Sequence, residues 1–291
     1  MKNQIRIAIL DLYEGEVNEG MRCIRQLVED FKNESSYLVS SAVYDIRGKL
    51  EVPTLEFDIY ISSGGPGSPL TSAGSEWETL YFQLMDGIQK HNQKSDTKKF
   101  VFLICHSFQI FCRFYGLAKV SKRKSTAFGV MPVHKTRAGQ HEPLFNELEE
   151  PFWVIDSRDY QITQPNDSAI KKSGGHILCI EKERPLIPLE RAVMSIRINN
   201  EIIGTQFHPE ADYHSMFMYL IREEKKKYVV GKYGENKYKE MLQNLNDPEK
   251  IKKTYHTIIP AFLREVEKSK INYIHSSGLE MMQTENPPFG G

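Results

Sequence analysis

The stretch Lys99-Phe100-Val101-Phe102-Leu103-Ile104-Cys105-His106-Ser107-Phe108-Gln109 decides the fold of this chain. Its five apolar residues Phe100–Ile104 predict a buried strand, and Cys105 follows with no spacer. Apolar residues then recur at helical spacing as far as Tyr115. A strand that passes directly into a helix through one nucleophilic residue is typical of a nucleophile elbow. The Cys105 thiol would then lie at a helix N-terminus, where free N–H groups and the helix dipole favour the thiolate.

Strands and helices alternate around this stretch. The sequence predicts strands at 5–10, 37–43, 58–62 and 100–104, and helices at 18–31, 77–91 and 107–115. This alternation predicts an α/β fold, with a mostly parallel open sheet and helices on both faces. Ligands of such sheets bind at the carboxyl ends of the strands, where Cys105 and the loop after Ser62 would meet.

That loop reads Ser63-Gly64-Gly65-Pro66-Gly67-Ser68-Pro69. Its glycines would let main-chain N–H groups approach a ligand closely and form an oxyanion cradle. Taken alone, the loop is more typical of a surface turn, because Gly, Pro and Ser dominate turns. No Gly-Lys-Ser/Thr follows it, so it is not a phosphate-binding P-loop. Cys105 has a similar alternative, because free cysteine is among the most buried residue types.

The second half of the chain supplies a histidine and a carboxylate. Short strands or turns are expected at 130–136, 152–155 and 161–163, a strand at 177–180, and a hairpin formed by 192–198 and 201–207. The hairpin leads into His208-Pro209-Glu210, whose first and third side chains point to the same side if the segment is extended. Glu210 would then orient the His208 imidazole toward Cys105 and complete a Cys-His-Glu relay. The alternative is a surface histidine beside a proline turn.

The composition excludes several classes of function. Lys and Arg together number 38, as do Asp and Glu, so the zero formal charge argues against nucleic-acid binding. No apolar run approaches the length of a membrane span. The four cysteines have no Cys-x-x-Cys spacing, which predicts free thiols, a cytoplasmic location and no zinc site. We expect neither a metal nor a cofactor.

Together these motifs resemble the class I glutamine amidotransferases, whose fold is flavodoxin-like, over residues 4–222. The matching segments are Asp11-Leu12-Tyr13 with Asn18, the loop 63–69, Cys105 with Gln109, Gly116-Leu117-Ala118-Lys119-Val120, and Gly204-Thr205-Gln206-Phe207-His208-Pro209-Glu210. The resemblance implies that Cys105 is the nucleophile, His208 the general base and acid, and Glu210 the orienting carboxylate. It implies an oxyanion hole from the backbone N–H groups of Gly65 and His106, with Gly64 and Gln109 beside the substrate.

The chain departs from the family at two places. The family's elbow usually reads Gly-x-Cys-x-Gly, and here Leu103 and Ser107 occupy the glycine positions, so Leu103 is expected to reshape the substrate pocket. The family often has Ser-His where this chain has Ser157-Arg158, in a segment that helps hold the α-amino and α-carboxylate groups of glutamine. The resemblance therefore implies substrate contacts for Ser157 and Arg158, with Arg158 as a carboxylate ligand.

The remainder of the chain predicts a helical extension. We expect an amidotransferase-like domain at 1–222 and a C-terminal extension at 223–291, after a last family helix at 213–221. The extension should hold helices at 232–244, 248–255 and 258–270, with Pro260 in a first turn, and an extended or disordered end at 286–291. It would cover the core, form a homo-oligomer contact or dock a partner.

Three functions follow as hypotheses. The first is hydrolysis of the glutamine side-chain amide through a cysteine thioester, with ammonia passing to a separate synthetase, because the chain has no nucleotide-binding motif. The second is a γ-glutamyl peptide hydrolase or transferase with the same triad, motivated by Leu103 and Arg158. The third is a catalytically idle binding module. The first two take a small molecule, glutamine or a γ-glutamyl compound.

Overall fold

The structure is a computed structural model that describes residues 4–16, 18–186 and 188–284. Its strands are β1 (Gln4–Asp11), β2 (Leu38–Asp45), β3 (Ile59–Ser62), β4 (Phe100–Ile104), β5 (Ala118–Lys135), β6 (Phe152–Pro165), β7 (His176–Glu181), β8 (Val193–Arg197) and β9 (Ile202–Thr205). Within the described residues they form one sheet in the order β2-β1-β3-β4-β9-β8-β7-β5-β6. Neighbours are parallel from β2 to β9 and antiparallel from β9 to β6. The expected open α/β sheet of the flavodoxin-like type is confirmed.

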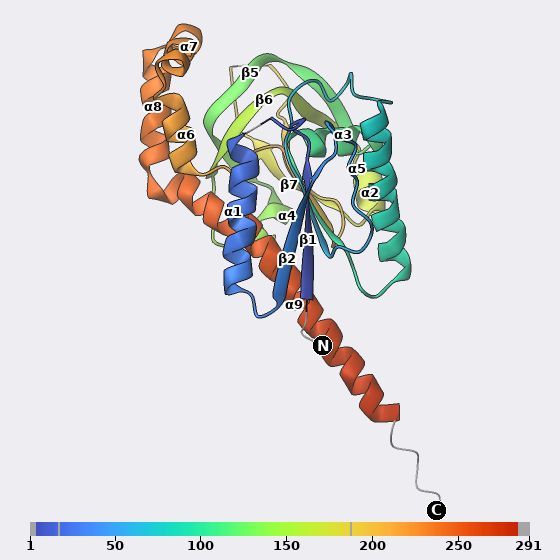
Figure 1. Ribbon diagram of the computed structural model, residues 1–291. Helices are drawn as coiled ribbons and strands as arrows, with labels where there is room; N and C mark the ends of the chain where they lie inside the picture. Colours follow the sequence, from blue (N-terminus) through green and yellow to red (C-terminus); the bar gives the residue numbers. More distant parts are fainter. Residues whose placement is uncertain (1–3, 17, 187, 285–291) are drawn as a thin grey trace, which may run out of the picture.

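Helices cover both faces of the parallel strands (Figure 1). They are α1 (Glu19–Glu34), α2 (Glu76–Lys94), α3 (His106–Phe114), α4 (Arg137–Gln140), α5 (Asp167–Lys172), α6 (Tyr213–Leu220), α7 (Glu223–Tyr233), α8 (Glu235–Asn246) and α9 (Lys253–Thr284), with short helical turns η1 (Pro143–Phe145) and η2 (Pro248–Lys252). Successive side chains of β1 point to opposite faces of the sheet, so this one strand contributes to the apolar layers on both faces. Ile7 and Ile9 lie in the apolar cluster under α1 and α9, whereas Ala8 and Leu10 lie in the cluster under α2, α3 and α5.

Helix α9 corrects one expectation from the sequence. Pro260 was expected only in a first helical turn, but it lies well inside α9, which begins at Lys253. A proline at such a position removes a helical hydrogen bond and costs about 3 kcal/mol. Residues on one face of α9 offset this cost, because they are fully buried in the core, and the Phe262 ring packs edge-on against Phe102 with 5.2 Å between centroids. These buried residues are Ile258, Ile259, Phe262, Leu263 and Val266.

The other tail helices pack on the antiparallel end of the sheet. The single helix expected at 232–244 is instead the end of α7 and most of α8, separated by Gly234 at a φ of 87°. Tyr238 and Met241 of α8 join a third apolar cluster with Val130 of β5 and Ile155 of β6. Strands β5 and β6 are also much longer than the short segments expected from the sequence.

Two further expectations concern the tail and its surroundings. The terminal segment 286–291, expected to be extended or disordered, lies outside the described residues. The division into domains 1–222 and 223–291 stays a prediction, and α9 shares its apolar cluster with β1 and β4. Among the described residues, no helix has both the length and the apolar character needed to span a membrane.

Candidate active site

Cys105 occupies a strained turn between β4 and α3. Its φ of 48° and ψ of −97° are unusual for a residue with a side chain. The backbone holds it there, because the Cys105 N–H donates to the Thr205 carbonyl at 2.8 Å and the Cys105 carbonyl accepts from Gln109 N–H at 2.9 Å. The expected elbow between a buried strand and a helix is therefore present in the backbone.

The two departures from the family's elbow have local structural explanations. The Ser107 hydroxyl accepts from the Ile104 N–H at 2.8 Å, so this small side chain ties the start of α3 to the end of β4. Leu103 is fully buried in the apolar cluster under α2 and α3, together with Phe108. The side chain of Leu103 therefore contributes to the core, and the structure gives no sign that it reshapes a substrate pocket.

His208 and Glu210 form a close pair just beyond β9. The backbone N–H of His208 donates to the Ile155 carbonyl of β6 at 2.9 Å, which fixes the segment across the sheet edge. The imidazole Nδ1 lies 2.8 Å from Glu210 Oε1. The Glu210 side chain is 1% exposed and that of His208 is 13% exposed, so the carboxylate is buried behind the ring. This arrangement leaves Nε2 as the free ring nitrogen.

The thiol and the imidazole meet beside Gly64. A Cβ added to Gly64 would lie 3.0 Å from His208 Cε1, which is too close, and 3.7 Å from Cys105 Cβ, which is ordinary contact. Burial lowers the pKa of His208, but the Glu210 carboxylate and the Cys105 sulfur outweigh it and hold this pKa well above its ordinary value. The pair therefore favours a protonated imidazole.

The loop after β3 brings backbone amides to the same place. A Cβ on Gly65 would lie 2.5 Å from the Leu12 carbonyl, so only glycine fits. Within the described residues, neither the Gly65 nor the His106 N–H donates a hydrogen bond to a protein group. Both amides, the expected oxyanion donors, are therefore free to bind a ligand oxygen.

The His106 side chain has a separate position from its amide. It is 2% exposed, and its ring centroid lies 6.4 Å from that of Trp77. Burial, together with the nearby Arg47 and Arg113, lowers the pKa of His106 to about 3. The His106 ring is therefore neutral near pH 7 and adds no positive charge beside the His208 imidazole.

The expected substrate-binding residues separate into two groups. Gln109 is buried one helical turn after Cys105, and its side-chain amide donates to the Tyr160 carbonyl at 3.3 Å. The Ser157 carbonyl lies 4.0 Å from Cys105 Sγ. The Arg158 side chain, by contrast, is only 1% exposed and donates from Nε to both oxygens of Asp156 at 2.9 and 3.0 Å.

The remaining nitrogens of Arg158 are also engaged. Nη1 donates to the Tyr160 carbonyl at 3.5 Å, and Nη2 lies 3.5 Å from Glu181 Oε1. The guanidinium is therefore held by two acidic residues inside the protein. These contacts give no support to the expected role of Arg158 as a ligand for a substrate carboxylate, so we do not propose it.

Two neighbours of Cys105 and His208, Gln206 and Tyr13, lie in segments that carried the resemblance, but no role was expected for either. The Gln206 side-chain N–H donates toward Cys105 Sγ over 3.8 Å, and the Tyr13 hydroxyl would lie 3.0 Å from a Cβ on Gly64. The signal for Gln206 was present, because period two along an extended segment puts it on the same side as His208. Tyr13 follows the end of β1, and only the three-dimensional arrangement brings its hydroxyl to the triad.

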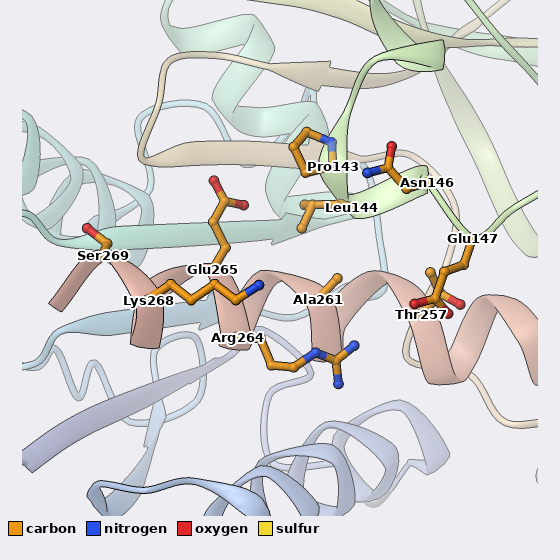
Figure 2. Close-up of a pocket in the computed structure, with 10 residues that line it drawn as sticks. All are labelled: Pro143, Leu144, Asn146, Glu147, Thr257, Ala261, Arg264, Glu265, Lys268 and Ser269. Atoms are coloured by element: carbon orange, nitrogen blue, oxygen red, sulfur yellow. The ribbon is translucent and has the colours of Figure 1, made fainter. Parts of the chain in front are cut away.

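A groove elsewhere on the molecule has a volume of about 560 Å³ and lies between η1 and α9 (Figure 2). One of its lining residues, Glu265, lies 3.3 Å from Arg197 at the end of β8. Because β8 runs antiparallel to β9, Arg197 lies beside the start of β9, whereas His208 follows the end of β9. The groove is therefore at the opposite end of the strands from His208. Among the described residues, no cluster of three or more His, Cys, Asp or Glu is arranged to hold a metal ion.

Comparisons with solved structures identify similar folds. A glutamine amidotransferase from Thermotoga maritima is 20% identical, with 90% of this chain and 98% of that chain covered at a TM-score of 0.63. A putative GMP synthase subunit from Thermoplasma acidophilum is 16% identical, with coverages of 94% and 98% and a TM-score of 0.52. The glutaminase domain of Trypanosoma brucei CTPS with bound acivicin is 15% identical, with coverages of 71% and 86% and a TM-score of 0.50.

Sequence comparisons give the family. No curated protein matches the chain in sequence. Residues 23–226, however, match the family described as glutamine amidotransferase class-I, a span that contains Cys105, His208 and Glu210. The chain belongs to the class I glutamine amidotransferase family.

Proposed function

We propose that this protein hydrolyses the side-chain amide of glutamine and delivers the ammonia to a separate synthetase. The observation that carries the proposal is the convergence of Cys105, the His208–Glu210 pair and the free amides of Gly65 and His106 at one edge of the sheet. A nucleophile, a proton carrier and two oxyanion donors are the groups that acyl transfer requires.

The reaction begins with the thiolate of Cys105 and the imidazolium of His208. The sulfur attacks the amide carbon, and the negative charge that develops on the carbonyl oxygen is stabilised by the Gly65 and His106 N–H groups. His208 gives its proton to the departing nitrogen, the C–N bond breaks, and ammonia leaves a γ-glutamyl thioester. His208 then takes a proton from water, which attacks the thioester. The C–S bond breaks, glutamate is released and the thiolate returns.

Glutamine is favoured over γ-glutamyl peptides as the substrate. The peptide hypothesis was motivated by Leu103 and Arg158, and both side chains are committed to the protein interior. The idle-module hypothesis is disfavoured by the closely paired His208 and Glu210 and by the strain at Cys105, since such strain is typical of functional sites. The synthetase is inferred from family membership, and similar folds include a CTPS glutaminase domain and a putative GMP synthase subunit.

The test measures glutamate release from glutamine and from γ-glutamyl amides, with the parent protein and with Cys105→Ala. We expect turnover of glutamine that Cys105→Ala abolishes and that Cys179→Ala, at a buried cysteine of β7, leaves unchanged. A strong preference for the γ-glutamyl amides would favour the peptide hydrolase instead. Glutamine turnover that survives Cys105→Ala would contradict the thioester mechanism.

A further inference from the structure

We propose that Ser63 is a positioning residue that sets the direction of the Gly65 N–H in the oxyanion hole. The inference rests on the proposed function. It concerns the peptide between Gly64 and Gly65, whose N–H is one of the two donors assigned to the oxyanion. Glycine residues on both sides leave this peptide free to rotate unless another group holds it.

The Ser63 hydroxyl holds this peptide from inside the protein. Ser63 is fully buried, and its hydroxyl donates to the Gly64 carbonyl at 2.8 Å. The same oxygen accepts from the Leu12 N–H at 2.9 Å, and the Ser63 N–H donates to the Leu10 carbonyl at 3.0 Å. Ser63 is therefore bound to Leu10 in β1 and to Leu12 just after it. Its hydroxyl also binds the Gly64 carbonyl of the loop.

The hydrogen bond from Ser63 to the Gly64 carbonyl also fixes the direction of the Gly65 N–H, because both groups belong to one planar trans peptide. The carbonyl and the N–H of one trans peptide point in opposite directions. When the Gly64 oxygen is held by Ser63, the Gly65 N–H must therefore point away from Ser63. A Cβ added to Gly64 would lie 3.0 Å from His208 Cε1 and 3.7 Å from Cys105 Cβ, so this peptide borders the reacting centre. We infer that the Gly65 N–H, pointing away from Ser63, is presented to that centre.

Two arginines hold the rest of the loop but not this peptide. Arg47 donates through Nη1 to the Pro66 carbonyl at 2.8 Å and packs on the Trp77 ring, 5.0 Å from its centroid. Arg113 donates to the Pro69 carbonyl. In the described residues, the Gly64 carbonyl has its side-chain contact with Ser63 alone. Loss of the Ser63 hydroxyl should therefore disorder the oxyanion donor while the loop stays in place.

The test compares Ser63→Ala with Ser195→Ala in glutaminase assays. Ser195 is the matched control, because it is also fully buried and donates to a glycine carbonyl, that of Gly204, at 2.9 Å. We expect Ser63→Ala to lower kcat about 10- to 100-fold with KM within about 2-fold of the parent value, since a lost oxyanion donor typically costs 100-fold or more. Ser195→Ala should keep the parental kcat.

Alkylation of Cys105 by iodoacetamide supplies a second readout. This displacement develops no oxyanion, so its rate should be the same in Ser63→Ala and in the parent. A parental kcat in Ser63→Ala, or an equal loss of kcat and alkylation rate, would overturn the inference while leaving the proposed function intact. A parent protein without glutaminase activity would overturn both. If Ser63→Ala does not fold, Ser63→Cys has nearly the same shape but a weaker donor, and it should also lower kcat, by less than the full loss of the hydroxyl would.

Discussion

The buried carboxylate of Glu210 contacts the imidazole of His208 through one oxygen, with 2.8 Å between Oε1 and Nδ1. Its second oxygen, Oε2, is buried without a hydrogen-bond partner among the described residues. The charge of this carboxylate is therefore poorly compensated except by the ring. This relationship explains why the pKa of His208 is held high despite its burial.

Glu210→Gln should lower both the pKa of His208 and the rate of the reaction. The amide keeps the shape but removes the negative charge, so burial then dominates and the pKa falls. We expect kcat to drop about 100-fold or more, as in other triads that lose their carboxylate. An NMR titration of the His208 ring measures the pKa directly. Glu34→Gln, at the exposed end of α1, is the control and should change neither quantity.

Glu210→Gln should also change how the free energy of unfolding depends on pH. In the parent, the pKa of folded His208 is above that of the unfolded chain, so its contribution to stability is complete below the unfolded pKa. This contribution is lost as the pH rises through the folded pKa. Urea unfolding across the alkaline range should therefore show a steeper loss of stability in the parent than in Glu210→Gln. Equal slopes would mean that Glu210 does not raise the pKa of His208.

Arg158→Leu should destabilise the protein. The guanidinium is buried against Asp156 and Glu181, so its removal leaves Asp156 in particular without a counter-charge. We expect a loss of about 3–5 kcal/mol in the free energy of unfolding, measured by urea denaturation. The exposed Arg137→Leu is the control and should change this quantity little. Unchanged stability with a raised KM for glutamine would instead restore the substrate-binding role expected from the sequence.

Pro260→Ala should stabilise the protein. Alanine restores a helical N–H within α9 and removes the clash of the proline ring with the preceding turn. The gain is reduced by about 0.4–1 kcal/mol, because alanine gives the unfolded chain more freedom. We expect the free energy of unfolding to rise by about 1–3 kcal/mol, with glutaminase activity unchanged. A decrease would mean that the buried face of α9 requires the local geometry that proline imposes.

The sequence predicted the strands at the end of the sheet that holds Cys105 and His208 well, because its signals there are local. The strand Phe100–Ile104 was placed at its observed bounds, and the hairpin before His208 formed as expected. Each depends on an apolar run and a turn that are adjacent in the chain. The α/β fold followed from the same alternation.

The missed features depend on contacts between distant parts of the chain. Pro260 is tolerated because α9 buries one face against β1 and β4, and no local pattern reports that burial. The buried position of Arg158 depends partly on Glu181 of β7, which is distant in the chain, and partly on Asp156, which is two residues away. The close approach of Tyr13 to Gly64 likewise joins the ends of β1 and β3.

Detection of a γ-glutamyl thioester on Cys105 would test the proposed mechanism most directly. Acid quenching during glutamine turnover, followed by peptide mass spectrometry, detects any covalent acyl group on a cysteine. We expect a γ-glutamyl adduct on Cys105 that is lost with time as glutamine is consumed. Release of glutamate with Cys105 unmodified throughout, or an adduct on Cys23, Cys112 or Cys179 instead, would contradict the mechanism.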